Sequence, residues 1–456
     1  MNELHLEIGA ALVYAGIFIL IFALGEIIRY LQPSCPELSR KFIHFAGGLT
    51  ALTFPRHIQS HWSILCLATG FAAVLVLAKM KGLLRSVHGI ERKSYGAMLF
   101  PVSVYLLFLL GQSRTILYFV SILVMTVSDT LAAVIGDRYG SIRYEVEGVT
   151  KSLEGSTVFF FVTFLCVHIS LLLMTPTGRL ESVLMAFVIA VLITAFEAVS
   201  PTGSDNFFVP LGTFFILGNM MKQPLPAMLN RIGILLAMMV ATAILTAKIK
   251  LFKTTGLIGM ILVNYAAWTL AGVTWFLPLL LGQILLYGLV AYFVDKVTEG
   301  ITGYQIKFLF YAVLLPVLLI FAANALHARL TFFLPYVTSI TTTLAIIGYF
   351  FLAILKPCQD EWLRCLARNR ALSILCCAGL SVAGVCLIPI FFHGQAVIVS
   401  LFIVFGATSF ALCLFHFLFQ KMGLGLQIVL RQRVRLLCSL IAVALVFLLQ
   451  EFAFSS

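Results

Sequence analysis

The sequence predicts an all-α, polytopic integral membrane protein with roughly 15–16 transmembrane helices. Two observations carry this prediction. The 456 residues are 61% hydrophobic and only 11% charged, and their mean hydropathy is +1.08. Soluble domains carry about 25% charged residues, so this composition excludes a soluble globular protein as well as a disordered chain. Apolar runs long enough to cross a bilayer also recur along the whole chain.

The first apolar run, at about residues 8–28, is expected to stay in the protein as a membrane helix. Glu3 and Glu7 precede it, where a cleavable signal would carry basic residues. No Arg- and Ser-rich transit peptide precedes it either, which favours a bacterial inner membrane over an organelle. The other expected spans are approximately 42–56, 62–78, 95–111, 115–136, 156–174, 182–200, 207–221, 230–247, 256–273, 275–294, 308–326, 331–355, 371–392, 396–420 and 436–453.

The distribution of basic residues tests this segmentation and orients the chain. When loops are assigned to alternate sides, 24 of the 30 Lys and Arg residues fall on one side. Cytoplasmic loops carry such an excess, so that side is predicted to face the cytoplasm. The net charge of +12 then reflects topology and contact with anionic lipid, and we expect no nucleic-acid partner.

Ionisable residues divide the chain into two predicted domains. Residues 1–250 hold polar clusters at or near the cytoplasmic ends of spans, whereas the spans of residues 251–456 carry almost no ionisable groups. We therefore expect a membrane domain with a functional site at 1–250 and an additional helical domain of unknown role at 251–456.

Four polar clusters in the first domain share the predicted cytoplasmic side, as a single active site requires. They occupy residues 40–44, 91–96, 128–140 with its continuation at 151–156, and 196–210.

The third cluster is the most informative. Asp129 lies inside an apolar run, where an ionisable side chain costs a few kcal/mol and indicates a functional site. The alternative is a carboxylate paired with Lys or Arg for packing alone. Gly136 and Gly140 follow at helical spacing and allow another backbone, or a phosphate chain, to approach closely.

The continuation of this cluster adds phosphate-binding chemistry. Lys151 supplies a positive charge, and Ser152 at a helix start supplies a further donor or a helix cap. The carboxylates of Asp129, Asp137 and Glu154 could hold a magnesium ion that bridges phosphates.

The remaining clusters add further polar groups. Glu197 is a second carboxylate inside an apolar run, and Asp205 with Asn206 follows a Pro-Thr-Gly-Ser turn. The Asp-Asn pair could supply a metal ligand or a general base, although by itself it is also typical of a turn. In the first cluster, Lys41 and His44 lie three residues apart and share a helical face.

The ordered set of clusters resembles the membrane family of CTP-dependent polyprenol kinases, which includes phytol, farnesol and dolichol kinases and CTP-dependent diacylglycerol kinase. No P-loop or protein-kinase signature is present. The matching motifs follow the family's order over residues 40–210. They are Arg40-Lys41-x-x-His44, Tyr95-Gly96, Ser128-Asp129-x-x-Ala132, Gly136, Gly140, Lys151-Ser152-x-Glu154-Gly155-Ser156, Glu197, and Asp205-Asn206-x-x-Val209-Pro210.

This resemblance implies a kinase that uses CTP with Mg²⁺ to phosphorylate a membrane lipid alcohol at the cytoplasmic face. The alcohol would be an isoprenoid such as phytol, farnesol or a polyprenol, or diacylglycerol. Catalytic roles are implied for Asp129, Lys151, Glu197 and Asp205, with Asp129 and Asp205 holding the metal. The residues implied in nucleotide binding are Arg40, Lys41, His44, Gly136, Gly140, Ser152, Glu154, Gly155 and Asn206.

Two other functions stay open. A CDP-diacylglycerol synthase-like phosphatidate cytidylyltransferase is similar in its Asp/Gly run and the Lys-x-x-Glu-Gly segment that follows. The Arg-Lys-x-x-His and Asp-Asn-x-x-Val-Pro motifs favour the kinase. The large number of spans is also compatible with a lipid transporter, although the second domain lacks a matching pair of polar clusters. The oligomeric state stays open too.

Overall fold

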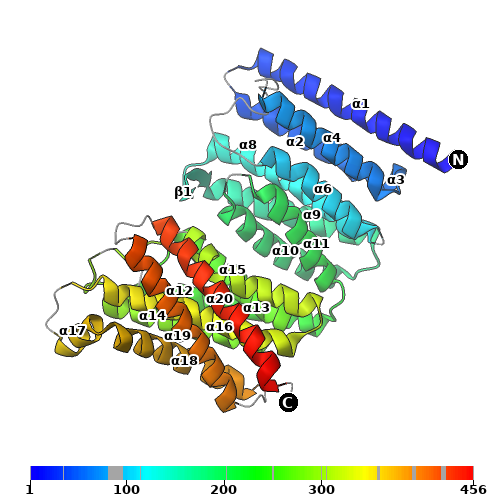
Figure 1. Cartoon of the computed structure of the whole chain (residues 1–456). Coiled ribbons are helices and arrows are strands. Elements are labelled where there is room, and N and C mark those ends of the chain that lie inside the picture. Colours follow the sequence, from blue (N-terminus) through cyan, green and yellow to red (C-terminus); the bar gives the residue numbers. More distant parts are fainter. Residues whose placement is uncertain are drawn as a thin grey trace. The chain divides into compact units, whose positions relative to one another are not determined.

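A computed structural model shows a chain built almost entirely of helices (Figure 1). It describes residues 2–33, 35–80, 96–112, 114–201, 203–248, 251–298, 300–304, 306–356, 360–392, 397–422 and 428–454. Eleven of the helices described are long and apolar enough to cross a membrane, and a bent helix pair raises this number to 12. The prediction of an all-α, multi-pass membrane protein is therefore confirmed.

The number of qualifying helices is smaller than the expected 15–16, because several expected spans form short helices. The helices α2, α6 and α11 have 17, 16 and 16 residues. A helix of 16 residues is about 24 Å long, which is less than the roughly 30 Å of a bilayer's hydrocarbon core.

The chain divides into two compact units, residues 1–234 and 235–456, and the division falls inside one helix, α12. Unit 1 holds the elements that build the site. They are α1 (Asn2–Leu31), α2 (Pro36–Leu52), α3 (Phe54–His57), α4 (His61–Met80), α6 (Gly96–Gly111), α7 (Thr115–Leu123), η1 (Val124–Ser128), α8 (Asp129–Tyr139), β1 (Arg143–Val146), β2 (Val149–Ser152), α9 (Leu153–Met174), α10 (Arg179–Val199), α11 (Asp205–Met220) and the start of α12 (Leu225–Lys248).

Five helices of unit 1 close a ring. Helix α1 packs on α2, α2 on α7, α7 on α6, α6 on α4, and α4 returns to α1. A second series of neighbours runs α8, α9, α10 and α11, and α11 packs on both α6 and α7. Figure 1 shows α1, α2 and α4 side by side, followed by α6 and the second series.

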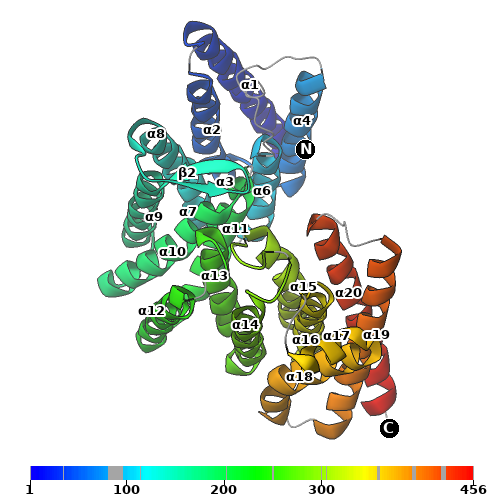
Figure 2. The same cartoon turned by 90° about the vertical axis from the view of Figure 1, so that its left-hand side faces the viewer.

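A β-hairpin, which the sequence analysis did not predict, joins α8 to α9. Strands β1 and β2 pair antiparallel, with Val146 opposite Val149. The two residues between them, Glu147 and Gly148, both have positive φ, as a tight hairpin turn of type I′ requires. Strand β2 lies against α8 and α9 (Figure 2), which fixes the position of its last residues beside those helices.

The helix α9 begins where its sequence predicts. Ser152 is its N-cap, and the side-chain oxygen accepts a hydrogen bond from the Gly155 N–H at 3.1 Å. The expectation that Ser152 could cap a helix is therefore confirmed.

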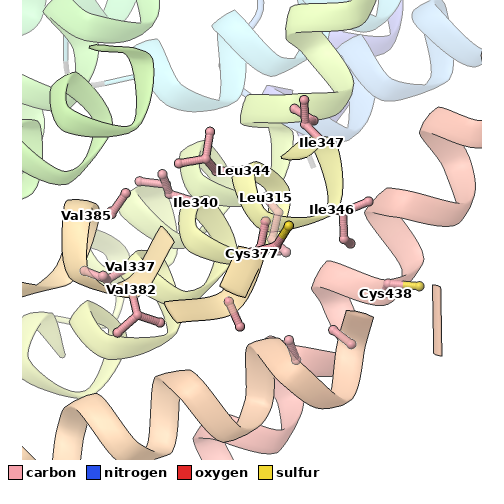
Figure 3. Packing of buried hydrophobic residues seen from close by; sticks show 14 of the residues in the cluster. Leu315, Val337, Ile340, Leu344, Ile346, Ile347, Cys377, Val382, Val385 and Cys438 are labelled. Atoms are coloured by element: carbon pink, nitrogen blue, oxygen red, sulfur yellow. The ribbon is translucent and has the colours of Figure 1, made fainter. Parts of the chain in front are cut away.

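Unit 2 is organised around one central helix, α16 (Arg329–Ala353). In its apolar 18-residue stretch, 78% of the residues are buried. It packs against α14, α15, α18, α19 and α20, and Figure 3 shows side chains of this apolar core. The other elements of unit 2 are α13 (Thr254–Ala271), α14 (Val273–Phe293), α15 (Ile306–Ala325), α17 (Glu361–Arg368), α18 (Arg370–Phe392), α19 (Val397–Met422) and α20 (Ile428–Phe454).

Candidate active site

Unit 1 contains a cavity of about 940 Å³ that has one charged and one apolar part. Eleven of the thirteen residues predicted for the site line this cavity, so the structure brings together clusters that lie far apart in the sequence. Its charged and polar lining includes Arg29, Glu37, Arg40, Lys41, His44, Asp129, Asp137, Arg143, Lys151, Ser152, Glu197, Asp205 and Asn206.

The first group of contacts joins α2 to the start of α8. Lys41 Nζ lies 2.7 Å from Asp129 Oδ2, and His44 Nε2 lies 3.5 Å from the same oxygen. The side chains of Lys41 and Asp129 are only 10% and 18% exposed. Lys41 and His44, which were predicted to share a helical face, thus both contact the Asp129 carboxylate.

A π-helical turn, η1, directly precedes Asp129 and positions its side chain beside Lys41 and His44. It interrupts the span formed by residues 115–139 immediately before Asp129. Its Met125 carbonyl oxygen lies 3.2 Å from His44 Nε2 and accepts a hydrogen bond from it. Gly48 of α2 makes this approach possible, because a Cβ there would lie 2.0 Å from Thr126 Oγ1. Such π-turns are frequent at functional sites.

The second group joins β2 to the end of α10. Lys151 Nζ lies 2.7 Å from Glu197 Oε1 and also donates to the Glu197 carbonyl oxygen. Burial alone lowers the pKa of the Lys151 ammonium, but the carboxylates of Glu197 and Asp205 outweigh burial and raise it. Lys151 is therefore a charged cation in the cavity wall at neutral pH.

Glu197 keeps one carboxylate oxygen for other partners. Its Oε2 is buried and has no hydrogen-bond partner within the described part of the chain. An unsatisfied carboxylate oxygen is costly when buried, so it indicates a position where a proton donor can be accommodated.

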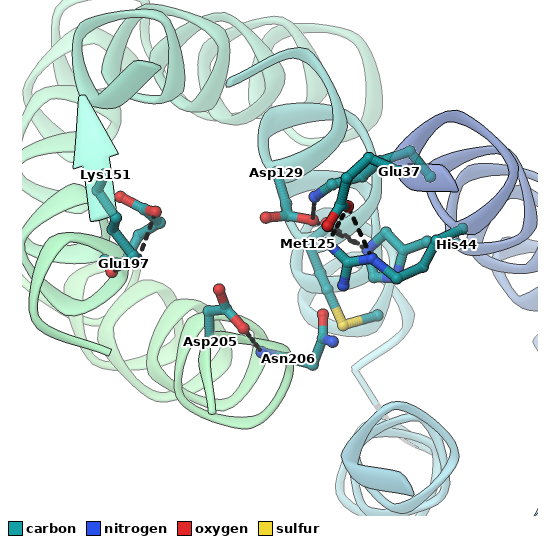
Figure 4. Close-up of polar contacts among 10 residues, drawn as sticks. Glu37, His44, Met125, Asp129, Lys151, Glu197, Asp205 and Asn206 are labelled. Atoms are coloured by element: carbon teal, nitrogen blue, oxygen red, sulfur yellow. Dashed lines mark hydrogen bonds and ion pairs between the residues drawn. The ribbon is translucent and has the colours of Figure 1, made fainter. Parts of the chain in front are cut away.

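Asp205 and Asn206 start α11 on a third side of the cavity. The Asp205 carboxylate accepts a hydrogen bond from the Asn206 N–H at 3.0 Å, as expected at a helix start. Figure 4 shows Lys151 with Glu197 facing Asp129 with His44, and Asp205 with Asn206 below both groups.

The small residues act mainly in helix packing. A Cβ on Gly136 would lie 2.8 Å from Ser152 Oγ and 3.3 Å from Gly155 Cα. A Cβ on Gly140 would lie 2.2 Å from the Gly136 carbonyl oxygen. Gly136 and Gly155 still line the cavity, whereas Gly140 does not. The close backbone approach expected at these glycines is therefore present between α8 and α9 at Gly136, whereas Gly140 lies against Ser152.

Glu154 also lies outside the cavity lining. Its carboxylate accepts hydrogen bonds from the Ser141 N–H at 2.9 Å and the Ile142 N–H at 3.1 Å, and from the Ser141 hydroxyl. It holds the loop between α8 and β1, which positions the hairpin that carries Lys151.

The sequence reasoning missed several charged residues of the cavity wall. Glu37 pairs with Arg40 at 2.7 Å, and Arg29 and Arg143 also line the cavity. The spacing of Glu37 and Arg40, three residues apart in a helix, is a signal that could have identified the pair. The second predicted cluster, at 91–96, lies outside the described residues except for Gly96, which lines the cavity.

The donor set fits a magnesium ion that is shared with phosphates. In the part of the chain that the structure describes, no three His, Cys, Asp or Glu residues gather closely enough to hold a metal by themselves. Mg²⁺ is usually bound by one or two carboxylates together with water and substrate phosphates. Asp129 and Asp205 supply such carboxylates in the cavity wall.

Comparison with known proteins finds one informative relative. A phytol kinase of Synechocystis sp. is 33% identical over 218 residues, which are 47% of this chain and 91% of that protein. No family model matches the chain, and no solved structure matches it. The match thus covers nearly the whole relative but only about half of this chain.

Proposed function

The chain belongs to the phytol kinase family, and from this premise we propose that it transfers the γ-phosphoryl group of CTP to the hydroxyl of an isoprenoid alcohol in the unit 1 cavity. The membership makes the chain a phosphotransferase that acts on an alcohol. The match covers 218 residues and unit 1 has 234, and we take unit 1 as the catalytic unit.

The observation that carries the proposal is the two-part character of the cavity. Its charged part is lined by Asp129, Lys151, Glu197 and Asp205, and its apolar part is lined by side chains of α1, α2, α3, α4 and α6. An alcohol with a long hydrocarbon tail and one hydroxyl matches this division, because the tail avoids water while the hydroxyl reaches the charged part.

Three cations of the cavity are proposed to bind the triphosphate. Lys151, Lys41 and Arg40 each contact a carboxylate, with nitrogen–oxygen distances of 2.7 Å. A phosphate oxygen can replace these carboxylates as the partner of a Lys or Arg side chain. All three residues also lie on the side of the membrane that is predicted to be cytoplasmic, where the nucleotide is available.

Mg²⁺ is proposed to be held by Asp129 and Asp205. When bound, the ion would neutralise charge on the phosphates of the nucleotide. The residues of the chain then act mainly by positioning and by electrostatic stabilisation, as is usual in phosphoryl transfer.

The transfer step makes one bond and breaks one. The alcohol oxygen forms a bond to the γ-phosphorus, and the bond from that phosphorus to the β–γ bridging oxygen breaks, so CDP leaves with that oxygen. The hydroxyl proton passes to a carboxylate. Glu197 Oε2 is our first candidate acceptor because it is buried without a partner in the described structure, and Asp205 is the second.

The proposal is tested with the purified full chain in detergent, supplied with Mg²⁺ and CTP. Phytol, farnesol, a longer polyprenol, diacylglycerol and phosphatidic acid are offered separately, and the products of nucleotide and lipid are identified. We expect CDP and a phosphorylated alcohol from an isoprenoid alcohol. Release of pyrophosphate with phosphatidic acid, or no reaction of CTP with any alcohol, would contradict the proposal.

A matched pair of variants shows whether the cavity is the site. Lys151→Met should lower kcat/KM at least about 100-fold, a typical loss when one group that stabilises developing charge is removed. Lys222→Met removes an exposed lysine that does not line the cavity and should retain activity. Equal activity in both variants would exclude Lys151 from the site.

A further inference from the structure

The apolar part of the cavity has a defined lateral boundary. Four of the five helices that close the ring, α1, α2, α4 and α6, contribute apolar side chains to the lining. Phe18 comes from α1, Ala51 from α2, Ala68 from α4 and Val104 from α6. The lining is thus supplied by helix faces that meet inside the ring.

Its depth follows from the spacing of lining residues on two neighbouring helices. On α2, charged Lys41 and apolar Ala51 both line the cavity and are ten residues apart, which is about 15 Å along the helix. On α1, Arg29 and Phe18 are eleven residues apart, or about 16 Å. Both helices therefore give a similar distance, about 15–16 Å, from the charged part to the far apolar end.

Aromatic side chains lie at this far end. The Phe18 ring is 4.4 Å from the Phe71 ring and 6.3 Å from the Phe54 ring. Phe18 and Phe54 are buried, with 8% and 3% of their surfaces exposed. A Cβ on Gly47 of α2 would lie 3.3 Å from the Phe18 ring, so α1 and α2 close tightly at this level.

A hydrogen-bonded cluster of Tyr14, Thr53 and His57 packs against Phe54. The Tyr14 ring packs edge-on against the Phe54 ring at 4.8 Å. The Tyr14 hydroxyl lies 2.8 Å from Thr53 Oγ1 and 2.8 Å from His57 Nδ1. These three residues do not belong to the cavity lining, whereas Phe54 does.

We propose that the apolar part of the cavity is a binding site for the alcohol's hydrocarbon tail, and that Phe18 and Phe54 form an end wall that limits the length of the tail. The inference rests on the proposed kinase function. Ala68, on α4 between the lining residues Ile64 and Leu75, keeps the middle of the site wide enough for a chain. The occupant is a long isoprenoid chain with a polar head, because the apolar part continues directly into the charged part.

The test measures kcat/KM of the full chain for geraniol, farnesol, phytol and a long polyprenol, with CTP and Mg²⁺. Ala68→Phe fills the middle of the tail site, and it should lower the phytol-to-geraniol ratio at least about tenfold, the smallest effect typical of one extra methylene group in an apolar pocket. Ala73→Phe is the matched control, because Ala73 is exposed on the same helix and does not line the cavity.

Removing the end wall should have the opposite effect. Phe18→Ala is expected to raise the polyprenol-to-farnesol ratio by about tenfold. Phe161→Ala, which removes an exposed phenylalanine outside the lining, should not change the ratio. Phe18→Leu repeats the test with a smaller loss of packing if the alanine variant does not fold.

The outcomes separate this inference from the proposed function. A wild-type chain that phosphorylates no alcohol contradicts the function itself. If the wild-type chain is a kinase but Ala68→Phe and Phe18→Leu leave its kcat/KM ratios between long and short alcohols unchanged, the proposed end wall is wrong. An equal loss with every alcohol in both Ala68→Phe and the milder Ala68→Leu overturns it as well, since a tail site must discriminate by length.

Discussion

Charged side chains of the cavity wall form ion pairs with one another. Lys41 contacts Asp129, Lys151 contacts Glu197, and Arg40 contacts a glutamate one turn earlier. An isolated charge in such a setting is strongly unfavourable, and pairing makes its burial possible. The sequence raised packing and function as alternatives for Asp129. The structure shows that its ion pair lines the cavity, so one residue can serve both purposes.

The two purposes can be separated with a double variant. Asp129→Asn alone leaves Lys41 without its carboxylate and should lower the free energy of unfolding by about 3 kcal/mol. Adding Lys41→Met removes the orphaned charge and should restore most of that stability while kinase activity stays at least about 100-fold reduced. Thermal unfolding and kcat/KM are measured on the same samples.

The control is the more exposed pair of Lys296 and Asp360, whose side chains are 29% and 41% exposed. The corresponding double variant should change stability by less than about 1 kcal/mol and leave activity intact. If the Asp129→Asn, Lys41→Met variant regained full activity, the pair would be structural only.

The raised pKa of Lys151 predicts a pH response. Wild-type Lys151 stays protonated beyond its ordinary value of 10.5, so its contribution to nucleotide binding should be constant from neutral to moderately alkaline pH. In Lys151→His the side chain loses its charge at a much lower pH, because the ordinary pKa of an imidazole is about 6.5 and that of a lysine is about 10.4. The ratio of variant to wild-type KM for CTP should therefore increase with pH. A ratio that is flat across this range would show that the charge at position 151 does not contact the nucleotide.

At the scale of elements, three local features bring the residues together. The π-turn η1 aligns Asp129 with α2, the hairpin β1–β2 carries Lys151 to the end of α10, and glycines let α8 approach α9. Each feature depends on contacts between segments that are distant in the sequence or on a short turn. The close approach at the glycines was expected from the small residues of the sequence. The π-turn and the hairpin do not follow from hydrophobic periodicity, which explains why the sequence did not predict them.

The glycine packing makes a specific prediction. In Gly140→Ala the new Cβ would lie 2.2 Å from a backbone oxygen, so α8 or the hairpin must shift. We expect a loss of about 1–3 kcal/mol in the free energy of unfolding. In Gly70→Ala, by contrast, no heavy atom lies within 4 Å of the new Cβ, and stability should be unchanged or slightly higher. Equal thermal unfolding of both variants would contradict the packing described for Gly140.

At the scale of the whole molecule, the chain combines two units of similar size. Unit 1 carries the cavity and every residue predicted for the site. Unit 2 surrounds the buried helix α16 with an apolar core, and its spans carry few ionisable groups. The observed division at residue 234 falls inside α12, whereas the predicted domain boundary at residue 250 lies just after the end of that helix.

The sequence predicted best those features that depend on local physical constraints. Apolar runs predicted the membrane class, and carboxylates inside those runs predicted Asp129 and Glu197 as site residues. The alternation of basic loops predicted that the clusters share one side of the membrane, and eleven of the thirteen predicted site residues line one cavity. The pairing of Lys151 with Glu197 and the shape of the tail site could not be predicted, because both depend on how helices pack in three dimensions.

The most direct test of the central claim follows the phosphorus atom that is transferred. CTP labelled at the γ-phosphate and CTP labelled at the α-phosphate are supplied in parallel to the full chain with Mg²⁺ and phytol. We predict that the lipid product carries the γ-label only, and that Asp129→Asn abolishes this transfer. A lipid product that carries the α-label would instead show transfer of a cytidylyl group and would contradict the account.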